Sequence, residues 1–501
     1  MKGRIAGIVA IALLAGALAA GAAAAEAVPL YDTAEIVLFS SASYNGDAGE
    51  PNPFDLDMTA QVTAPSGKSY TVAGFFDGDG AGGAVGQVFK VRVAVDETGT
   101  WRWRVASTVP GLDGRAGEFR VQGRLPGSFG RGPIVPSPAR PRFFQQQDGG
   151  PVFLRGKFLD MTAPSPIQFS HTMFSEKLSD ADRQAMLDRN LSLRLNKMNV
   201  YLANRGDYGG TSTTPWVGTA AANDKSRFDL RRWHMYEQWV ERMRDAGVVA
   251  HLWFFADDSG FASLPDADRQ RLIRYGMARL SAFVNTMFIL TLEWQEGWRA
   301  EEVNADGDFL QRNNPWARGV SVHGLTGDFA FPGAPWVDYL DLQAGNFVGH
   351  PAVHALGLAN RVLAEKPLIQ EEFGLGDEIA INRQKSWAAF MAGAAGVGTG
   401  AFLAPLAAFT ERINFPRMDP ADSLVLAGGA YGLAEKGKAY VFYLYEGGSV
   451  RVNLRGARGR FAVDWYNPRD GSFHRAAAVQ GGRLLTFTAP APEDWVLYIR
   501  K

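Results

Sequence analysis

Strand-like and helix-like patterns alternate through residues 143–432, and this alternation limits the possible folds more than any other feature of the chain. Short apolar runs of the kind found in buried parallel strands are repeatedly followed by longer stretches with helical spacing. The apolar runs stand at residues 152–159, 198–202, 248–255, 287–293, 319–323, 339–343, 366–374 and 396–403. No glycine-rich phosphate loop follows the first run, so the pattern favours a (β/α)8 TIM barrel over an open doubly wound sheet.

The segments on either side of this barrel have a different texture. Residues 28–122 alternate apolar and polar side chains between clusters of Gly, Asp, Asn and Pro, which predicts an immunoglobulin-like β-sandwich. Residues 433–501 return to this texture and predict a C-terminal β-sandwich. Residues 123–142 are rich in Gly, Pro and Arg and are predicted to be a linker. The expected fold class is a multidomain α/β plus all-β protein with a central (β/α)8 barrel.

The first 27 residues resemble an export signal. Lys2 and Arg4 precede an apolar run that closes on Ala25-Glu26-Ala27, as in a cleaved secretory signal peptide. An uncleaved anchor is the alternative, but Ala and Gly dominate the run. No second apolar stretch of about 20 residues follows, so we expect a secreted or periplasmic protein with no membrane contact after cleavage.

Composition narrows the expected partners. The 51 basic and 52 acidic residues nearly cancel, which gives no electrostatic reason to expect nucleic acid. There is no cysteine, and the 7 histidines show no i, i+4 pair near carboxylates, so no metal or other cofactor is expected. Aromatic residues are plentiful, and their flat faces suit sugar rings. A polysaccharide or oligosaccharide is the expected partner, and the oligomeric state stays open.

Carboxylates stand at the ends of two predicted barrel strands. Glu293 ends the fourth strand, and Glu371 and Glu372 end the seventh, so they would meet at the C-terminal mouth of the barrel. A retaining glycosidase needs two carboxyl groups about 5–5.5 Å apart, one to protonate the leaving oxygen and one to attack the anomeric carbon. We expect Glu293 to be the acid/base and Glu372 the nucleophile. Alternatively, Glu371 and Glu372 open the next helix, where acids suit the dipole.

Other polar and aromatic side chains follow the same strands. Asp257 and Asn346 also stand at strand ends, and the loop 293–298 supplies rings for stacking or a lid over the rim. His251 and His323 could bind sugar hydroxyls, orient Glu372, or serve the structure alone. The residues expected to bind substrate are Lys157, Asp160, Tyr201, Asn204, His251, Trp253, Trp294, Glu296, His323, Asp341, Gln343 and Glu371.

A family resemblance extends this interpretation. Glu293 on strand four and Glu372-Phe373-Gly374 on strand seven resemble the cellulase- and mannanase-like clan of retaining (β/α)8 glycoside hydrolases. The whole layout is similar to exported bacterial proteins with an immunoglobulin-like domain, an apiosidase-like barrel and a sandwich of the putative collagen-binding type. The C-terminal part of the resemblance is carried by three motifs, at residues 447–450, 465–471 and 494–497.

One departure from the family pattern leaves two alternatives open. Members of this clan usually carry Asn directly before the acid/base, where this chain has Leu292. The pair Gln295-Glu296 imitates the expected dipeptide, so Glu296 is the alternative acid/base. The other alternative is a non-catalytic carbohydrate-binding or matrix protein on a degenerate barrel, because barrels carry many functions.

Overall fold

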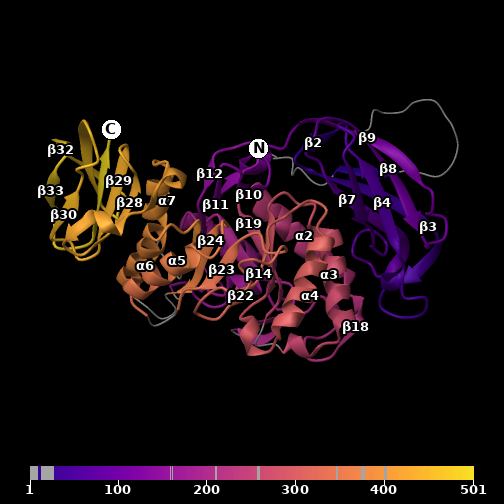
Figure 1. Cartoon of the computed structure of the whole chain (residues 1–501). Helices are drawn as coiled ribbons and strands as arrows, with labels where there is room; N and C mark the ends of the chain where they lie inside the picture. The colour runs from indigo at the N-terminus through magenta and orange to yellow at the C-terminus, as the bar shows by residue number, and fades with distance from the viewer. Residues whose placement is uncertain are drawn as a thin grey trace.

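The computed structural model arranges the chain as three parts in a row (Figure 1). An indigo N-terminal sandwich and a yellow C-terminal sandwich lie on either side of a central part that contains the helices. The multidomain α/β plus β class predicted from the sequence is confirmed. The residues that the structure describes are 9–12, 27–157, 159–160, 162–208, 211–256, 260–345, 348–373, 378–399 and 403–501.

The N-terminal sandwich consists of two sheets. One has the strand order β1 (Val9–Ala12), β3 (Thr33–Asn45), β7 (Val85–Ala94), β6 (Phe75–Phe76). The other has the order β2 (Val28–Leu30), β9 (Ala116–Arg124), β8 (Gly99–Ser107), β4 (Met58–Thr63), β5 (Ser69–Ala73). In β8, Trp101 and Trp103 are buried while Arg102 and Arg104 are exposed, as the period of two in a strand requires. Apart from β1, the predicted signal peptide lies outside the described residues up to Glu26.

The predicted linker 123–142 has a structure of its own. It contributes β10 (Ile134–Ser137) and the start of β11 (Arg140–Gln146), which with β12 (Pro151–Val152) form a three-stranded antiparallel sheet. Pro136 is tolerated because β10 is an edge strand with a register shift beside this proline. A high content of proline therefore did not exclude strands here.

The central part, named the α/β domain below, contains parallel strands in two ladders. The first ladder is β14 (Lys197–Tyr201), β19 (Val249–Phe255), β20 (Thr286–Thr291), β21 (Val320–Ser321). The second is β22 (His323–Gly324), β23 (Leu340–Gln343), β24 (Leu368–Phe373), β25 (Gly396–Thr399), β13 (Leu154–Gly156). Only Val322 separates β21 from β22. At the other junction, the backbone N–H of Asn196 donates to Arg155 O over 3.0 Å, between the starts of β13 and β14.

Helices surround these strands (Figure 1). They are α1 (Asp180–Ser192), α2 (Leu230–Asp245), α3 (Asp266–Leu280), α4 (Ala300–Arg312), α5 (His350–Arg361), α6 (Ile379–Met391) and α7 (Ala404–Thr410). Asp229 caps α2 by accepting from Arg232 N. Two hairpins follow β14, formed by β15 (Asn204–Tyr208), β16 (Thr211–Thr213), β17 (Trp216–Gly218) and β18 (Asn223–Phe228). Within the described chain, every helix is too short or too polar to cross a bilayer.

The C-terminal sandwich pairs a six-stranded and a three-stranded sheet. The larger has the order β26 (Asp419–Pro420), β28 (Ala430–Glu435), β29 (Ala439–Leu444), β34 (Trp495–Arg500), β31 (Arg460–Tyr466), β32 (Phe473–Gln480). The smaller has the order β27 (Val425–Ala427), β30 (Ser449–Asn453), β33 (Leu484–Thr488). The expected start at residue 433 falls inside β28, so this sandwich takes in strands from residue 419 onward.

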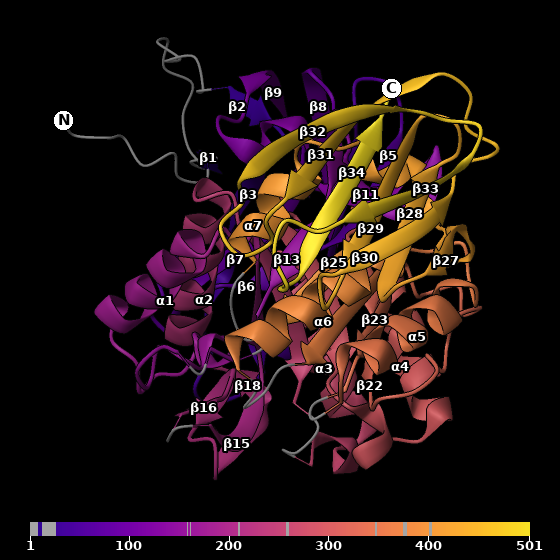
Figure 2. The same ribbon diagram turned by 90° about the vertical axis from the view of Figure 1, so that its left-hand side faces the viewer.

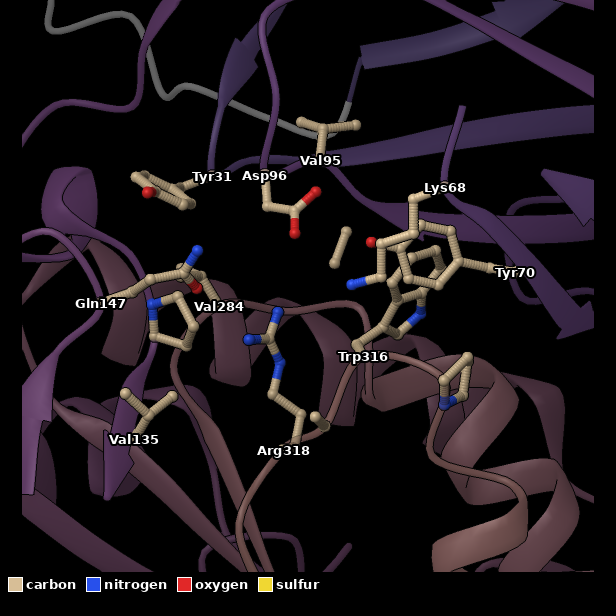
Figure 3. A pocket seen from close by; sticks show the side chains of 14 residues that line it. Tyr31, Lys68, Tyr70, Val95, Asp96, Val135, Gln147, Val284, Trp316 and Arg318 are labelled. Atoms are coloured by element: carbon tan, nitrogen blue, oxygen red, sulfur yellow. The ribbon is translucent and has the colours of Figure 1, made fainter. Parts of the chain in front are cut away.

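Buried charges attach the N-terminal sandwich to α2 and α3. Arg92 on β7 donates two hydrogen bonds to Glu237 on α2, at 2.6 and 3.0 Å. Arg279 on α3 forms an ion pair with Asp77 at 2.8 Å. Separating a buried ion pair would leave uncompensated buried charges, which is costly. These contacts therefore fix the sandwich against the α/β domain. A pocket lies beside this junction (Figure 3).

The C-terminal sandwich packs on α6 and α7, as the turned view shows (Figure 2). Arg383 of α6 donates two hydrogen bonds of 2.9 Å to the carboxylate of Asp494, which also accepts from Tyr443 Oη. Tyr466 Oη donates to Pro405 O in α7 over 2.6 Å. Asp494 and Tyr466 belong to the motifs that carried the C-terminal resemblance, so part of each motif serves to hold the sandwich on the α/β domain.

Candidate active site

Two glutamates at the ends of parallel strands have a rare backbone conformation. Glu293 lies two residues beyond β20 with φ of 35°, and Glu372 lies within β24 with φ of 46°. Residues other than glycine seldom adopt this left-handed region, and such strain gathers at functional sites. The two residues expected to be catalytic from the sequence are therefore both held in conformations that the surrounding structure must enforce.

A β-bulge explains the conformation at Glu372. Along the pairing of β24 with β25, Gln370 lies opposite Val397 and Phe373 lies opposite Thr399. Three steps on β24 thus match two on β25, and the extra residue falls at Glu371 or Glu372. A bulge redirects side chains and is common beside active sites. Here it gives two adjacent carboxylates different surroundings, since Glu371 is fully buried while the Glu372 side chain is 13% exposed.

His323 lies between the two glutamates. Its Nε2 atom is 3.8 Å from Glu372 Oε2, and its Nδ1 atom accepts from the backbone N–H of Glu293 over 3.5 Å. Burial, with a smaller contribution from the Lys197 charge, lowers the pKa of His323 to about 3. The imidazole is therefore neutral at ordinary pH and connects the ends of β20 and β24 through hydrogen bonding and packing.

Gln343 positions the carboxylate of Glu293. The Oε1 atom of Gln343 accepts from Thr326 N over 3.0 Å and from Thr326 Oγ1 over 2.8 Å. Because a backbone N–H can only donate, the oxygen of the Gln343 amide must face Thr326. Its nitrogen therefore faces Glu293 and donates to Glu293 Oε1.

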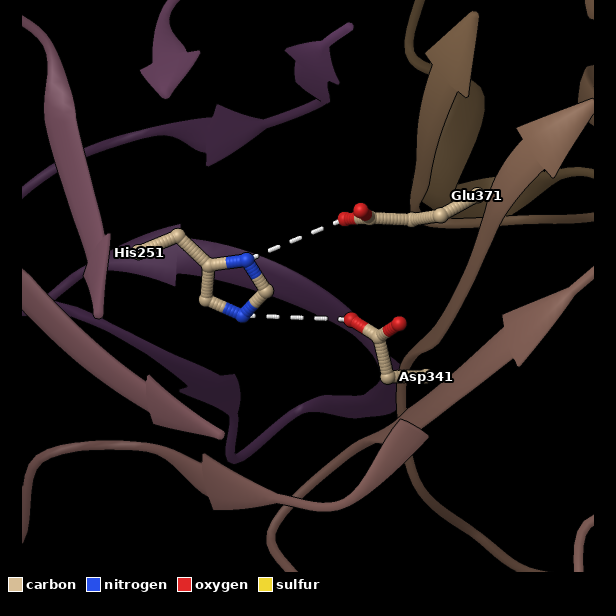
Figure 4. Close-up of side chains that lie close together, drawn as sticks. All are labelled: His251, Asp341 and Glu371. Carbon is tan, nitrogen blue, oxygen red and sulfur yellow. Dashed lines mark ion pairs between the residues drawn. The ribbon is translucent and has the colours of Figure 1, made fainter. Parts of the chain in front are cut away.

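A layer of buried polar side chains lies next to these glutamates, on the interior side of the strands. Lys197 Nζ donates to Glu371 Oε1 and to Asn199 Oδ1, and Asn199 Nδ2 donates to Glu371 Oε2. His251 lies 3.8 Å from both Glu371 and Asp341 (Figure 4). Both oxygens of Asp341 are buried and have no hydrogen-bond partner among the described residues.

Burial decides the charges in this layer. Burial and the nearby Glu371 charge raise the pKa of Asp341 well above its usual value. Burial and the Lys197 charge lower the pKa of His251 well below its usual value. In both groups the neutral form is favoured, and both lie beside the buried ion pair of Lys197 with Glu371.

The same residues resemble a metal site in composition but do not fit one. Ligand atoms of His251, Asp341 and Glu371 all lie within 4.8 Å of one another (Figure 4). However, the ammonium group of Lys197 bonds to Glu371 and lies 3.4 Å from His251 Nδ1. The ammonium group already occupies the space beside Glu371 and His251, so a metal ion would have to displace it.

Two glycines leave room for the buried ion pair. Gly156 on β13 and Gly398 on β25 are register partners. A Cβ atom at Gly156 would lie 2.9 Å from Lys197 Cε, and one at Gly398 would lie 3.0 Å from Glu371 Cγ. Both distances are closer than ordinary contact, so a side chain at either position would push against the buried ion pair.

The remaining predicted residues fall into separate groups. Lys157 and Asp160 form a buried ion pair of 3.0 Å, and Asp160 also accepts from Arg189. Burial opposes ionisation of Asp160, but Arg189 and Lys157 outweigh it and lower its pKa to about 2. Tyr201 and Trp253 are fully buried neighbours with ring centroids 6.0 Å apart. These buried residues support the strand ends from inside the α/β domain.

Residues of the loop after Glu293 lie nearer the surface. Trp294 is partly buried, and its ring centroid is 5.1 Å from that of Phe331. Glu296 is exposed at the end of the 3₁₀ helix Trp294–Glu296. Asn204 is fully buried at the start of β15. Asp257, Asn346 and Gly374 lie outside the described residues.

Sequence reasoning missed Lys197, Asn199 and Tyr339. The second strand was expected to begin at residue 198, but β14 begins at Lys197. Since alternate residues of a strand share a face, Lys197 and Asn199 could have been grouped with Tyr201. Tyr339 likewise shares a face with Asp341, and its hydroxyl lies 2.7 Å from His251 Nε2. The period of two along each strand was the available signal.

Two family models match the ends of the chain. Residues 27–108 match "Domain of unknown function (DUF5060)", and residues 420–500 match "Putative collagen-binding domain of a collagenase". The chain therefore carries a domain of the second family, as its C-terminal motifs predicted. Both matches lie outside the strands that carry Glu293 and Glu372. No curated protein matches the chain.

Solved structures share the fold. A putative glycoside hydrolase from Bacteroides vulgatus superposes with a TM-score of 0.75 at 17% identity, covering 94% of this chain and 99% of that chain. A family 5 glycoside hydrolase from the same organism gives 0.61 at 15% identity, covering 74% and 93%. A third structure, named glycoside hydrolase, gives 0.59 at 14% identity, covering 74% and 98%. At these identities the comparison shows a shared fold.

Proposed function

We propose that this protein is an exported glycoside hydrolase that cleaves O-glycosidic bonds of a polysaccharide or oligosaccharide with retention of configuration. The observation that carries the proposal is that the imidazole of His323 meets both the backbone N–H of Glu293 and the carboxylate of Glu372, and that both glutamates have left-handed backbones. The α/β domain is, in this proposal, a (β/α)8 barrel of the apiosidase-like type. The shared fold with glycoside hydrolases supports it.

The proposed mechanism assigns one role to each glutamate. A carboxylate oxygen of Glu372 attacks the anomeric carbon and forms a glycosyl-enzyme ester, while the carboxylic acid of Glu293 protonates the leaving oxygen. Glu293 then takes a proton from water, whose oxygen attacks the anomeric carbon and releases Glu372. The hydrogen bond from Gln343 holds the Glu293 carboxyl in place through both steps.

Glu293 is the better acid/base because of its neighbours. Its carboxyl group accepts from Gln343, and its backbone N–H donates to His323, whose other ring nitrogen approaches Glu372. Glu296 is exposed on the following 3₁₀ helix. Proton transfer requires the acid to lie within hydrogen-bonding reach of the scissile oxygen. That oxygen is bonded to the carbon that Glu372 attacks, so the acid should lie close to Glu372.

Export is part of the same proposal. Cleavage after the predicted signal peptide would leave a mature protein beginning near Val28, in the periplasm or outside the cell. The mass of the protein recovered from an expressing cell tests this: removal of residues 1–27 is the expected result, and an intact N-terminus in the membrane fraction contradicts it.

The decisive experiment is hydrolysis of a broad panel of plant and bacterial polysaccharides by the mature protein. Glu372→Gln and Glu293→Gln are expected to lose at least about a hundredfold in rate, since general acid/base groups typically contribute 10²–10⁴-fold. Glu296→Gln separates the two acid/base assignments, and the exposed Glu301→Gln is the matched control.

The stereochemistry gives an independent readout. NMR of the first sugar released should show the anomer of the substrate bond, as double displacement requires. Release of the opposite anomer would show that the mechanism is inverting and would contradict the proposed double displacement. Binding of a glycan without cleavage by the wild type would instead make the barrel a carbohydrate-binding scaffold.

A further inference from the structure

A pocket of about 220 Å³ lies between the N-terminal sandwich and the α/β domain (Figure 3). Val284, before β20, and Arg318, before β21, line it from the α/β side. It therefore opens at the N-terminal ends of these strands, whereas Glu293 follows the C-terminal end of β20. The pocket is separate from the proposed catalytic site.

Three charged side chains line this pocket. The Lys68 ammonium lies at its exposed rim, 4.7 Å from the centroid of the Tyr70 ring. Asp96 and Arg318 face one another without forming an ion pair. The Asp96 carboxylate and the Arg318 guanidinium point into the space from opposite sides (Figure 3). Arg318 is buried and donates to the backbone carbonyls of Ser281 and Ala282, at 2.9 and 3.3 Å. Among the described residues, neither Arg318 nor Asp96 has a charged partner within 4 Å.

The pKa values of both groups are shifted against their charged forms. Burial lowers the pKa of Arg318 to about 10, and burial raises the pKa of Asp96. One oxygen of Asp96 is buried and has no hydrogen-bond partner in the part of the chain that the structure describes. A buried polar group that lacks partners is costly, so a ligand that donates to Asp96 and accepts from Arg318 would remove part of that cost.

Aromatic side chains form the walls. The rings of Tyr70 and Trp316 lie 4.8 Å apart and tilt by 42°, and Tyr31 faces the pocket from the other side (Figure 3). Tyr31, Tyr70 and Asp96 come from the N-terminal sandwich, whereas Trp316 and Arg318 come from the α/β domain. Both parts of the chain are therefore needed to build the pocket.

The lining selects among ligand classes. Between Asp96 and Arg318, an anion would meet the Asp96 carboxylate and a cation would meet Arg318, so a singly charged ligand gains one contact and suffers repulsion from the other. The third charge, on Lys68, is exposed at the rim, where water and salt screen it. A neutral polyol offers hydroxyls that both donate and accept, together with C–H faces for the aromatic walls. The volume is below the 300–1,000 Å³ typical of drug-sized ligands, which limits the occupant to about one ring.

We propose that this pocket binds one neutral sugar residue, as a second carbohydrate site built jointly by the N-terminal sandwich and the α/β domain. The choice of a sugar rather than another polyol rests on the proposed function. The site gives the N-terminal sandwich a role: it holds one part of a glycan while another part of the same glycan is cleaved.

The test uses saturation-transfer NMR on the mature Glu372→Gln protein with glucose, galactose, mannose, xylose and arabinose as separate probes. At about 10 mM, a site with a dissociation constant near 1 mM is almost saturated. Transfer from at least one sugar is expected, and Asp96→Asn should weaken that binding about tenfold or more, because it removes a charged acceptor. The exposed Asp47→Asn, in the same sandwich, is the matched control.

A second variant guards against misfolding and against binding at the catalytic site. Trp316→Phe keeps an aromatic ring but presents a smaller flat surface, so it should weaken the binding of the same sugar. An unchanged melting temperature of this variant would show that the fold is intact. Galacturonate is added as a charged probe. The proposal is overturned if no neutral sugar binds, if binding survives both variants unchanged, or if galacturonate binds and the five neutral sugars do not. Failure of polysaccharide hydrolysis leaves this outcome unaffected, so the two proposals fail independently.

Discussion

The Nε2 atom of His323 lies 3.8 Å from the Oε2 atom of Glu372, while the other ring nitrogen of His323 faces the backbone N–H of Glu293. One buried imidazole is thus in contact with the residues at the ends of β20 and β24. Because the ring is neutral, it adds no positive charge that would form an ion pair with the carboxylate nucleophile. His323 acts in our proposal as a positioning residue.

His323→Gln should lower the hydrolysis rate constant by about tenfold to a hundredfold, the effect of a catalytic group displaced by about 1 Å. Since the pKa of His323 is about 3, the wild-type rate profile between about pH 5 and pH 8 should contain no ionisation of this residue. The apparent pKa values of the profile should therefore be the same in the variant. Loss of a limb near neutrality in the variant would show that His323 titrates there.

Gln343 offers a way to change the ionisation of Glu293 without touching it. Gln343→Glu places a second carboxyl group where an amide now donates to Glu293, and two adjacent carboxylates raise the pKa of one of them. The acid/base limb of the rate profile should move up by about one pH unit or more. Gln480→Glu, exposed on β32, is the control and should leave the profile unchanged. An unmoved limb in Gln343→Glu contradicts the assignment of Glu293.

The strand positions were accessible from the sequence because buried parallel strands are continuous apolar runs. The run at 248–255 corresponds closely to β19. The three-stranded sheet formed by β10, β11 and β12 was not predicted, since its first strand contains a proline that only an edge position tolerates.

The buried polar layer was harder to predict for a physical reason. Lys197 begins β14, and a lysine at the edge of an apolar run normally marks the end of the buried segment. Its burial depends on Glu371, 174 residues away, and on the space left by Gly156 and Gly398. Such a match between distant positions is a property of the packed structure, not of any local pattern.

Asp341→Asn should stabilise the protein increasingly as pH rises. The pKa of Asp341 is raised in the folded state, so the folded protein keeps a proton that the unfolded chain releases above about pH 4. Wild-type stability therefore falls with rising pH, by up to about 1.4 kcal/mol per pH unit from this group. Asparagine does not ionise, so urea unfolding at about pH 4 and pH 7 should show the variant gaining on the wild type at the higher pH. Equal differences at both pH values would mean that Asp341 ionises in the folded state.

Gly398→Ala tests whether the glycine pair is needed for the buried ion pair. The new Cβ atom would lie 3.0 Å from Glu371 Cγ, and Glu371 cannot move aside because Lys197 and Asn199 hold both its oxygens. Overpacking of this kind costs about 1–3 kcal/mol, partly offset by about 0.4–1 kcal/mol from the stiffer unfolded chain. The Cβ atom of Gly456→Ala would meet no atom of the described residues within 4 Å, so this variant should be neutral or slightly stabilising. A lower unfolding midpoint for Gly398→Ala alone is the expected result, and equal midpoints for the two variants would show that the layer can relax around the added methyl group.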